Sequence, residues 1–332
     1  MSSRFIEREK PMKRIAGCLK CLAYTLVLST VAPHGQAQQY PNRAIRMVLP
    51  FAAGGGTDTF MRVLVQGMNE SPGHTYILDN RPSDGGNVSL AFVAKADPDG
   101  YTIAVSTPII AVNPILYPRV QYRSGDFSAI SLLGRAPALI VMNPQVPARN
   151  VAELIRLAKS RPGSLSYGAP TGSGPYLAME MFRAMAEIDV RHIPYKSTTT
   201  VAIDMMGGVI DMASMTAPSV IGLVRANKLR AIAQTGETRL AIVADVPTLD
   251  EAGLKGFNVT TWYMALGPAK LPVAIANHLN GEFVKALNLP DVRKRSLENG
   301  VDEIIGSSAQ DASVFLRNES VRWAKVLKPI PE

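Results

Sequence analysis

Short β-type runs alternate with helical runs along most of this chain. Residues 44–49 form an apolar strand-like run that ends at Pro50, and Phe60, Leu64 and Met68 then repeat at helical spacing. Similar strand-like runs occupy residues 76–80, 101–105 and 139–142. This alternation predicts α/β architecture. At roughly 150 residues per domain, a chain of 332 residues predicts two lobes, each with its own core.

The first 37 residues have the order of a secretory signal. A basic stretch precedes an apolar run at residues 21–32, and Gly35 and Ala37 place small residues before the expected cleavage point. The apolar run is shorter than the roughly 20 residues that span a bilayer. We expect a signal peptide at residues 1–37 and an exported chain with no membrane span. Translation from Met1 and from Met12 both fit this pattern.

Cys18 precedes the apolar run, whereas a lipidated cysteine follows it, which argues against lipidation. Removal of the signal also changes the charge. The whole chain has 35 basic and 27 acidic residues, of which six and two lie in residues 1–37, so 29 and 25 remain and the net charge falls from +8 to +4. Without a basic patch interleaved with aromatic residues, no nucleic-acid partner is expected.

A glycine-rich segment lies between the first strand and the first helix of the expected fold. It comprises Phe51, Ala52, Ala53, Gly54, Gly55, Gly56, Thr57 and Asp58. Three glycines allow a bend with exposed N–H groups, and a helix N-terminus adds unpaired donors, so such a segment binds anions. Thr57 or Asp58 would be the N-cap. A tight structural turn is the alternative. The segment matches neither a P-loop nor a dinucleotide fingerprint.

A second segment repeats this design after a strand at residues 165–167. The segment includes Thr171, Gly172, Ser173 and Gly174. Pro175 suits a first helical turn, and Ser173 is a good cap before it. We expect two helix N-termini that face each other across a cleft and suit a carboxylate ligand.

Catalytic motifs are scarce in the sequence. After residue 37 the histidines are His74, His192 and His278, which form no metal-binding motif. The segment around Ser173 lacks the spacing of a nucleophile elbow. We therefore expect no enzyme, no metal site and no cofactor. A secreted hydrolase or transferase would need a nucleophile–base pair, and none is found.

The sequence contains an ordered series of short motifs. The first is Tyr40-Pro41-Asn42-Arg43, followed by the glycine-rich segment at residues 50–58. Later motifs are Asn80-Arg81-Pro82, Gly85-Gly86-Asn87, Pro98-Asp99-Gly100-Tyr101-Thr102, Asn113-Pro114 with Leu116-Tyr117, Pro194-Tyr195-Lys196, Asp245-Val246-Pro247-Thr248 and Glu251-Ala252-Gly253. This ordered series resembles the Bug proteins, the periplasmic solute-binding components of tripartite tricarboxylate transporters, and the resemblance covers essentially residues 40–328.

The resemblance implies a type II-like, two-lobed periplasmic binding protein, with each lobe a sheet flanked by helices and two strands crossing between the lobes. Lobe 1 would comprise residues 38–141 and 262–332, and lobe 2 residues 142–261. Crossing strands near residues 139–143 and 259–265 would form the hinge. The protein would be a monomer that captures a small organic carboxylate and delivers it to the transporter's membrane subunits. A periplasmic sensing role is the alternative, because both roles use closure on a ligand.

The resemblance also implies where the ligand lies. Ser106 and Thr107 would form the floor of the cleft, and Tyr176, Tyr195, Lys196 and Thr216 would complete its lining. The sequence departs from the family pattern at three places, which leaves the identity of the carboxylate open. They are Pro175-Tyr176 where a histidine is common, Ser197 where glycine is usual, and residues 215–219.

Overall fold

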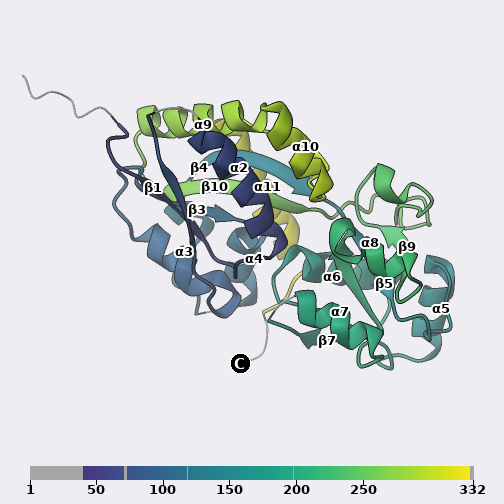
Figure 1. Ribbon diagram of the computed structural model, residues 1–332. Coiled ribbons are helices and arrows are strands. Elements are labelled where there is room, and N and C mark those ends of the chain that lie inside the picture. Colours follow the sequence, from purple (N-terminus) through teal and green to yellow (C-terminus); the bar gives the residue numbers. More distant parts are fainter. Residues whose placement is uncertain (1–39, 71–72, 118, 197, 330–332) are drawn as a thin grey trace, which may run out of the picture. The chain divides into compact units, whose positions relative to one another are not determined.

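The computed structural model describes residues 40–70, 73–117, 119–196 and 198–329 (Figure 1). The predicted signal peptide at residues 1–37 lies outside the described residues. Residues 43–329 contain two β-sheets, one of six strands and one of five. In the described part of the chain, no helix combines the length and apolar character that crossing a membrane requires.

The first sheet combines strands from both ends of the chain. Its strands are β1 (Ile45–Leu49), β2 (Tyr76–Asn80), β3 (Thr102–Ser106), β4 (Phe127–Ala136), β10 (Thr261–Pro268) and β11 (Glu303–Ile304), in the order β11-β4-β10-β3-β1-β2. β1 is parallel to β2 and β3, and β10 is antiparallel to β3 and β4. The accompanying helices are α2 (Gly56–Asn69), α3 (Asn87–Ala94), α4 (Ile109–Leu116), α9 (Val273–Leu287), α10 (Pro290–Glu298) and α11 (Ala309–Ala324).

The N-terminal α2 packs against the C-terminal α9 and α10, and Figure 1 shows these three helices side by side. The second sheet is instead built from the middle of the chain. Its strands are β5 (Ala138–Met142), β6 (Ser166–Ala169), β7 (Arg191–Pro194), β8 (Met212–Thr216) and β9 (Arg230–Gln234), in the order β7-β6-β8-β5-β9. Its helices are α5 (Val151–Ser160), α6 (Gly174–Ala186), α7 (Thr198–Met206) and α8 (Ala217–Arg225).

In both sheets the chain reverses its direction of winding at the strand next to one edge. The chain leaves β1 through α2 to β2 and then returns through α3 to β3 on the other side of β1. In the second sheet it leaves β6 through α6 to β7 and returns through α7 to β8. These reversals open the carboxyl ends of the parallel strands, where ligands bind in open α/β sheets.

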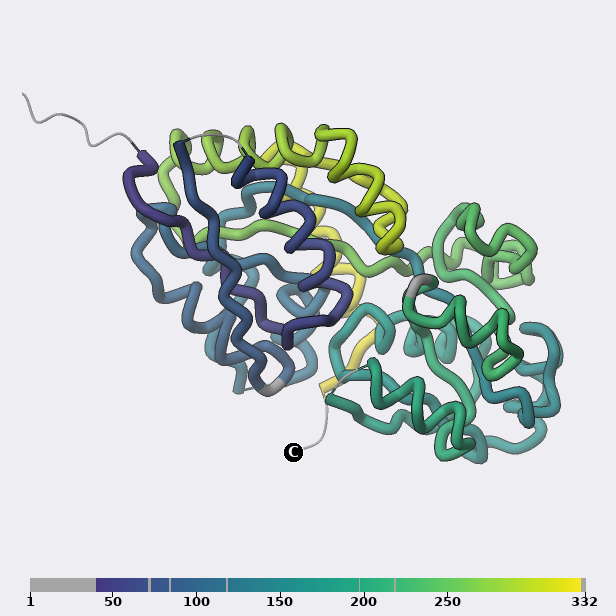
Figure 2. The backbone as a smooth tube through the Cα atoms, viewed as in Figure 1, coloured from purple at the N-terminus to yellow at the C-terminus, as the bar shows by residue number. Residues whose placement is uncertain are grey.

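The chain passes from the first sheet to the second at Pro137, which lies between β4 and β5. β5 pairs with β8 and β9, so it belongs entirely to the second sheet. The chain returns between Gln234 and Thr261, where β10 joins the first sheet. Figure 2 shows the teal and green middle of the chain around one sheet and the two ends of the chain around the other. The lobe boundaries stay a prediction, and this strand pairing favours a first boundary at Pro137 instead of residue 141.

The second sheet is buried on both faces, as strands between helices require. Leu139 and Val141 of β5 pack in one apolar cluster with residues of α7 and α8. Ile140 and Met142 point to the opposite face and pack with residues of α6. This explains why the apolar run at 139–142 is continuous instead of alternating.

A buried carboxylate anchors the strand by which the chain returns to the first sheet. Glu319 of α11 accepts hydrogen bonds at the same oxygen, Oε2, from the indole N–H groups of Trp262 (2.9 Å) and Trp323 (3.0 Å). Arg322 bonds its other oxygen at 3.3 Å and also donates to the carbonyl of Asn258. α11 therefore fixes both β10 and the segment that precedes it.

Gly174, the first residue of α6, lies directly against β10. A Cβ at Gly174 would lie 1.9 Å from Thr261 Oγ1 and 3.2 Å from Thr261 Cα. Only glycine permits this approach, because the Cα belongs to the backbone and cannot rotate away. The second glycine-rich segment is therefore packed against the returning strand.

We expect Gly174→Ala to lower the free energy of unfolding by about 1–3 kcal/mol, because the added methyl group overlaps Thr261. Gly222→Ala in α8 is the matched control, since nothing lies within 4 Å of a Cβ there, and alanine is the better helix former. Urea unfolding followed by circular dichroism measures both. Equal stability of the two variants would contradict the packing described for Gly174.

Candidate functional site

The residues predicted for the ligand site follow the carboxyl ends of parallel strands in both sheets. Residues 51–58 follow β1. Ser106 is the last residue of β3, and Thr107 comes directly after it. In the second sheet, residues 171–176 follow β6, Tyr195 and Lys196 follow β7, and Thr216 ends β8. Their common position at these edges is the position at which open α/β sheets bind ligands.

The first glycine-rich segment leaves the beginning of α2 open. The N-cap is Gly55, which has no side chain to cap the helix, so the prediction of Thr57 or Asp58 as the cap is wrong. Residues 52–56 are exposed. The first N–H groups of the helix therefore remain available to another acceptor, and the helix dipole favours an anion there.

Asp58 does not present its carboxylate as a free group. Its Oδ2 accepts hydrogen bonds from the N–H of Gly54 and from Nε of Arg62, both at 2.8 Å, and its Oδ1 accepts from Nδ2 of Asn80 at 3.0 Å. Asn80 also donates to the carbonyl of Phe51. Asp58 is only 1 % exposed. In this structure it holds the first segment to the end of β2.

The pKa of Asp58 lies below its usual value. Burial alone would raise this pKa, but hydrogen bonds from Arg62, Gly54 and Asn80 and the charge of Arg62 together lower it. The carboxylate is therefore ionised at neutral pH. Since it lies beside the first turn of α2, its negative charge also interacts favourably with the helix dipole.

Ser106 and Thr107 are buried at the end of β3. Ser106 donates from Oγ to the carbonyl of Thr107 at 3.3 Å, and this carbonyl also accepts the N–H of Ile110 at the beginning of α4. Ser106 and the backbone of Thr107 therefore stabilise the turn between β3 and α4, and β3 is paired with β1, the strand that precedes the first segment.

The second glycine-rich segment satisfies most of its own hydrogen bonds. Ser173 is the N-cap of α6, as predicted, and its Oγ accepts the N–H of Tyr176 at 3.3 Å. The same Oγ donates to the carbonyl of Pro170 at 2.6 Å. Pro175 has no N–H to offer. The beginning of α6 is therefore a poorer source of donors than the uncapped beginning of α2.

An aromatic cluster lies beneath the second segment. The ring of His192 stacks on Tyr167 at 4.9 Å and meets Tyr176 edge-on at 4.8 Å. Its Nε2 donates to the carbonyl of Ala169 at 2.9 Å, because a carbonyl can only accept. Burial lowers the pKa of His192 and raises the pKa of Tyr176. The cluster is neutral at pH 7 and supports the strand end that carries residues 171–174.

The remaining predicted residues have different surroundings. The Tyr195 hydroxyl donates a hydrogen bond to Asp204 of α7 at 2.7 Å. Burial, together with the hydrogen bond and the negative charge of Asp204, raises the pKa of Tyr195 to about 12. Lys196 is exposed. Thr216 is half-buried at the beginning of α8, where its Oγ1 donates to Ser219 Oγ. The Tyr195 hydroxyl is thus engaged within its own lobe.

Two asparagines that the sequence does not single out as candidate site residues hold segments near these strand ends. Asn80 ends β2 and holds the first segment, and Asn113 of α4 is completely buried beside Gly85, Asn87 and Gly172. A polar residue placed directly after a strand was the available signal for Asn80. The position of Asn113 depends on contacts between distant segments and has no comparable signal.

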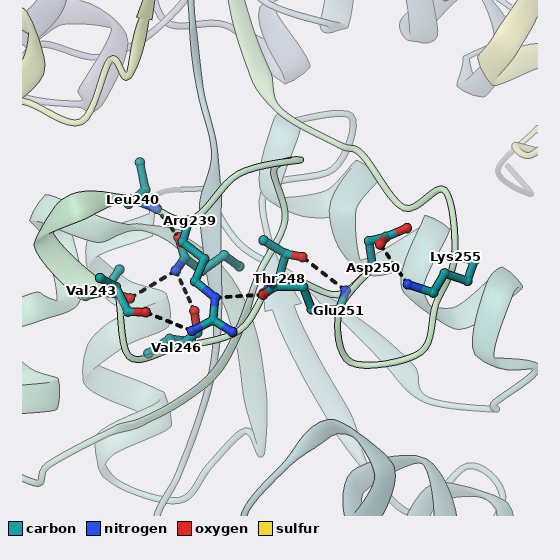
Figure 3. A network of polar contacts seen from close by, with 10 residues as sticks. Arg239, Leu240, Val243, Val246, Thr248, Asp250, Glu251 and Lys255 are labelled. Atoms are coloured by element: carbon teal, nitrogen blue, oxygen red, sulfur yellow. Dashed lines mark hydrogen bonds and ion pairs between the residues drawn. The ribbon is translucent and has the colours of Figure 1, made fainter.

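The motif at residues 245–253 forms a structural network (Figure 3). Glu251 accepts at Oε2 from the N–H of Thr248 (2.8 Å) and from Nε of Arg239 (2.7 Å). Buried Gln234 donates to the carbonyls of Val243 and Val246. These bonds fold the segment between β9 and β10 upon itself.

A surface hollow also lies at the opposite edge of the second sheet. Its lining includes Ser164, which precedes β6, and Asp211, which precedes β8, so it lies at the amino ends of these strands. Within the described residues, no cluster of three or more histidine, cysteine, aspartate or glutamate residues is suited to a metal ion.

Comparison with known proteins identifies the family. Residues 60–331 match the family model described as the tripartite tricarboxylate transporter family receptor. The chain belongs to this family. BugT of Bordetella pertussis is 29 % identical to this chain over 314 residues, which cover 93 % of this chain and 96 % of BugT.

Two solved structures show the same fold. The periplasmic binding protein BugD has a TM-score of 0.77 and 29 % identity, over 86 % of this chain and 97 % of BugD. The R. palustris protein Rpa4515, solved with adipate, has a TM-score of 0.79 and 31 % identity over the same shares. The expected two-lobed α/β fold of periplasmic binding proteins and the resemblance to the Bug family are both confirmed.

We expect Asp58→Asn to lower the free energy of unfolding at pH 7 by about 1–3 kcal/mol, because an amide cannot replace the ionised acceptor. Asp291→Asn is the matched control, since Asp291 also pairs with an arginine four residues later but is 71 % exposed. Denaturant unfolding measures both. Folding lowers the pKa of Asp58, so its contribution to the free energy of unfolding is fully present above the unfolded pKa of about 4. This contribution is lost as the pH falls further, through the lower pKa of the folded state. A difference that persists unchanged at pH 2 would contradict this role.

Folding lowers the pKa of His192, so the folded protein binds a proton at this residue less readily than the unfolded chain, whose histidine pKa is about 6.5. The free energy of unfolding should therefore fall as the pH drops below that value. Urea unfolding at pH 7.5 and 5.5 measures the decrease. In His192→Gln this decrease in the free energy of unfolding should be smaller. The remainder comes from His278, because burial lowers the pKa of that residue too. An equal decrease in wild type and variant would be inconsistent with this assignment.

Proposed function

We propose that this protein is a periplasmic receptor that captures a small organic carboxylate between its two lobes and delivers it to the membrane subunits of a tripartite tricarboxylate-type transporter. The observation that carries the proposal is the uncapped beginning of α2 at the carboxyl end of β1. It offers N–H groups and the positive end of a helix dipole in an exposed loop.

The electrostatics of the two edges support an anionic ligand. The helices α2, α3 and α4 begin after the parallel strands of the first sheet, and α6, α7 and α8 begin after those of the second. Each contributes partial positive charge at its beginning. The nearby Arg62 is already paired with Asp58. Recognition would therefore use backbone donors more than cationic side chains.

Family membership supports the remaining parts of the proposal. The matching family is one of transporter receptors, BugD is a periplasmic binding protein, and Rpa4515 was solved with a dicarboxylate, adipate. We infer by analogy that this chain is exported after removal of residues 1–37 and binds its ligand as a monomer, without turnover. We also propose that residues 51–57 hold one carboxylate and that residues 171–176 face it from the other lobe.

Gly56→Pro removes one donor of this site without disturbing the fold. Gly56 is the first residue of α2, where proline is favoured. The preceding Gly55 has φ −78° and ψ 168°, the extended conformation that a following proline requires. A Cβ at Gly56 meets nothing within 4 Å. The variant should therefore fold while lacking the N–H of residue 56.

We expect Gly56→Pro to weaken carboxylate binding about tenfold or more, the cost of a charge-assisted hydrogen bond. Gly56→Ala keeps the N–H and should bind like wild type. A thermal-shift screen of mono- and dicarboxylates beside their neutral amides selects the ligand, and isothermal titration calorimetry then compares the variants. Amides that stabilise the wild-type protein as well as the acids do would overturn the proposal, as would normal binding by folded Gly56→Pro.

A further inference from the structure

We propose that Gly172 is the point at which the two lobes meet when they close, and that the absence of a side chain there allows closure to be completed. A methyl group at residue 172 would stop the second glycine-rich segment short of α4 and leave the protein open. This inference rests on the proposed function, because the closure concerned is the one that encloses the ligand. It adds the contact that limits the movement.

The contact joins parts of the chain that accompany different sheets. Gly172 lies between β6 and α6 of the second sheet, whereas Asn113 and Leu116 belong to α4, which follows β3 of the first sheet. A Cβ built on Gly172 would lie 2.6 Å from Asn113 Oδ1 and 3.6 Å from Leu116 Cδ1. Real Cβ atoms essentially never come within 3.0 Å of another heavy atom. Only glycine therefore permits this approach of the second segment to α4.

The amide of Asn113 cannot turn aside to make room for a side chain. Its Nδ2 donates to the carbonyl of Gly85 and to Oδ1 of Asn87, both at 2.8 Å. Tyr122 donates to the same Asn87 oxygen at 3.1 Å. Rotation of the amide by 180° would place Oδ1 against the Gly85 carbonyl, which can only accept. A methyl group at residue 172 would therefore have to move the whole segment away from α4.

The Asn113 oxygen also makes the contact unfavourable in the absence of a ligand. Asn113 Oδ1 is buried, and it has no hydrogen-bond partner within the described part of the chain. The Cα–H groups of Gly172, which lies against it, are only weak donors. A buried acceptor without a strong donor is costly because it has lost water. Separation of the lobes would return water to this oxygen, so the contact opposes closure until a bound ligand favours it.

A second contact of the same segment lies at the connection between the lobes. Gly174 packs against Thr261 of β10, the strand by which the chain returns to the first sheet. In a hinge motion, atoms beside the hinge move little and atoms farther away move more. Gly172 instead meets α4, which is part of neither crossing segment. Opening should therefore separate Gly172 from Asn113 while Gly174 stays against Thr261.

The test measures the distance between the lobes directly. Both cysteines of the chain, Cys18 and Cys21, lie in the predicted signal peptide, so the mature chain can be labelled at introduced cysteines. Val88→Cys in α3 and Val209→Cys after α7 place one spin label in each lobe, at side chains that are 67 % and 70 % exposed. Double electron–electron resonance gives the distance distribution without ligand and with succinate, glutarate or adipate.

We expect an acid that binds to shorten this distance in the otherwise wild-type protein, and Gly172→Ala to keep the ligand-free distance. Its affinity should fall about tenfold or more, because the closed, binding-competent state is less populated. Gly256→Ala is the matched control. Gly256 has φ +78° and Gly172 has φ +77°, so alanine is similarly strained at both, but a Cβ at Gly256 meets nothing within 4 Å. Gly256→Ala should close and bind like wild type.

A double variant tests the same contact from the other side. Asn113→Ala removes the amide that a methyl group at residue 172 would meet, so Gly172→Ala combined with Asn113→Ala should close again when the acid is added. Gly172→Ala combined with Asn143→Ala is the control and should stay open. Asn143 is another buried asparagine, but its hydrogen bonds are to Met205 and Gln145 in the second lobe.

The outcomes separate this inference from the proposed function. If an acid binds but Gly172→Ala closes and binds as Gly256→Ala does, the inference is overturned and the proposed function stands. The inference also fails if Gly172→Ala is much less stable in urea than Gly256→Ala and still closes, since the contact is then a fixed part of the fold. If none of the three acids binds, the proposed function fails and the inference with it. If the variant with Asn113→Ala does not fold, the comparison of Gly172→Ala with Gly256→Ala still decides.

Discussion

Parallel strands joined by helices constrain this molecule more than any other feature. Because each crossover helix covers one face of a sheet, the chain must reverse around β1 and again around β6 to cover both faces. Each reversal separates the loops that follow neighbouring strands and leaves the beginnings of their helices at one edge. Residues 51–58 and 171–176 lie at these edges because of topology, before any ligand chemistry is considered.

The two edges are nevertheless equipped differently. Asp58 ties the first segment to β2 through Gly54 and Asn80, and this leaves the beginning of α2 ordered but uncapped. Ser173 caps α6 and turns its hydroxyl inward to Pro170. The free N–H donors at the beginning of α2 favour a negatively charged acceptor. The second segment, whose hydrogen bonds are mostly made within the loop, has fewer donors for a ligand. The proposed binding of a charged group at the first segment thus depends on the absence of a capping side chain at the beginning of α2.

Local patterns were sufficient to predict much of the fold. The strands β1, β2 and β5, the helix α2 and the cap at Ser173 depend on neighbours in sequence, and the structure has them close to the predicted residues. The site was less predictable because its details depend on distant partners. Asp58 looked like a cap or ligand, but Asn80, 22 residues away, engages its carboxylate. The contact of His192 with Tyr167 requires β6 to pair with β7, and the change of sheet at Pro137 depends on which strands β5 joins.

The anchoring of β10 by Glu319 has a consequence for spectroscopy. The whole chain has two tryptophans, and Trp262 and Trp323 both donate to the same oxygen of Glu319. Each is about 1 % exposed. Trp262 lies one residue after the contact of Thr261 with Gly174, at the point where the chain re-enters the first sheet. Intrinsic fluorescence of this protein therefore comes from a single buried pair at the strand between the sheets, and its emission reports on that strand instead of averaging over the molecule.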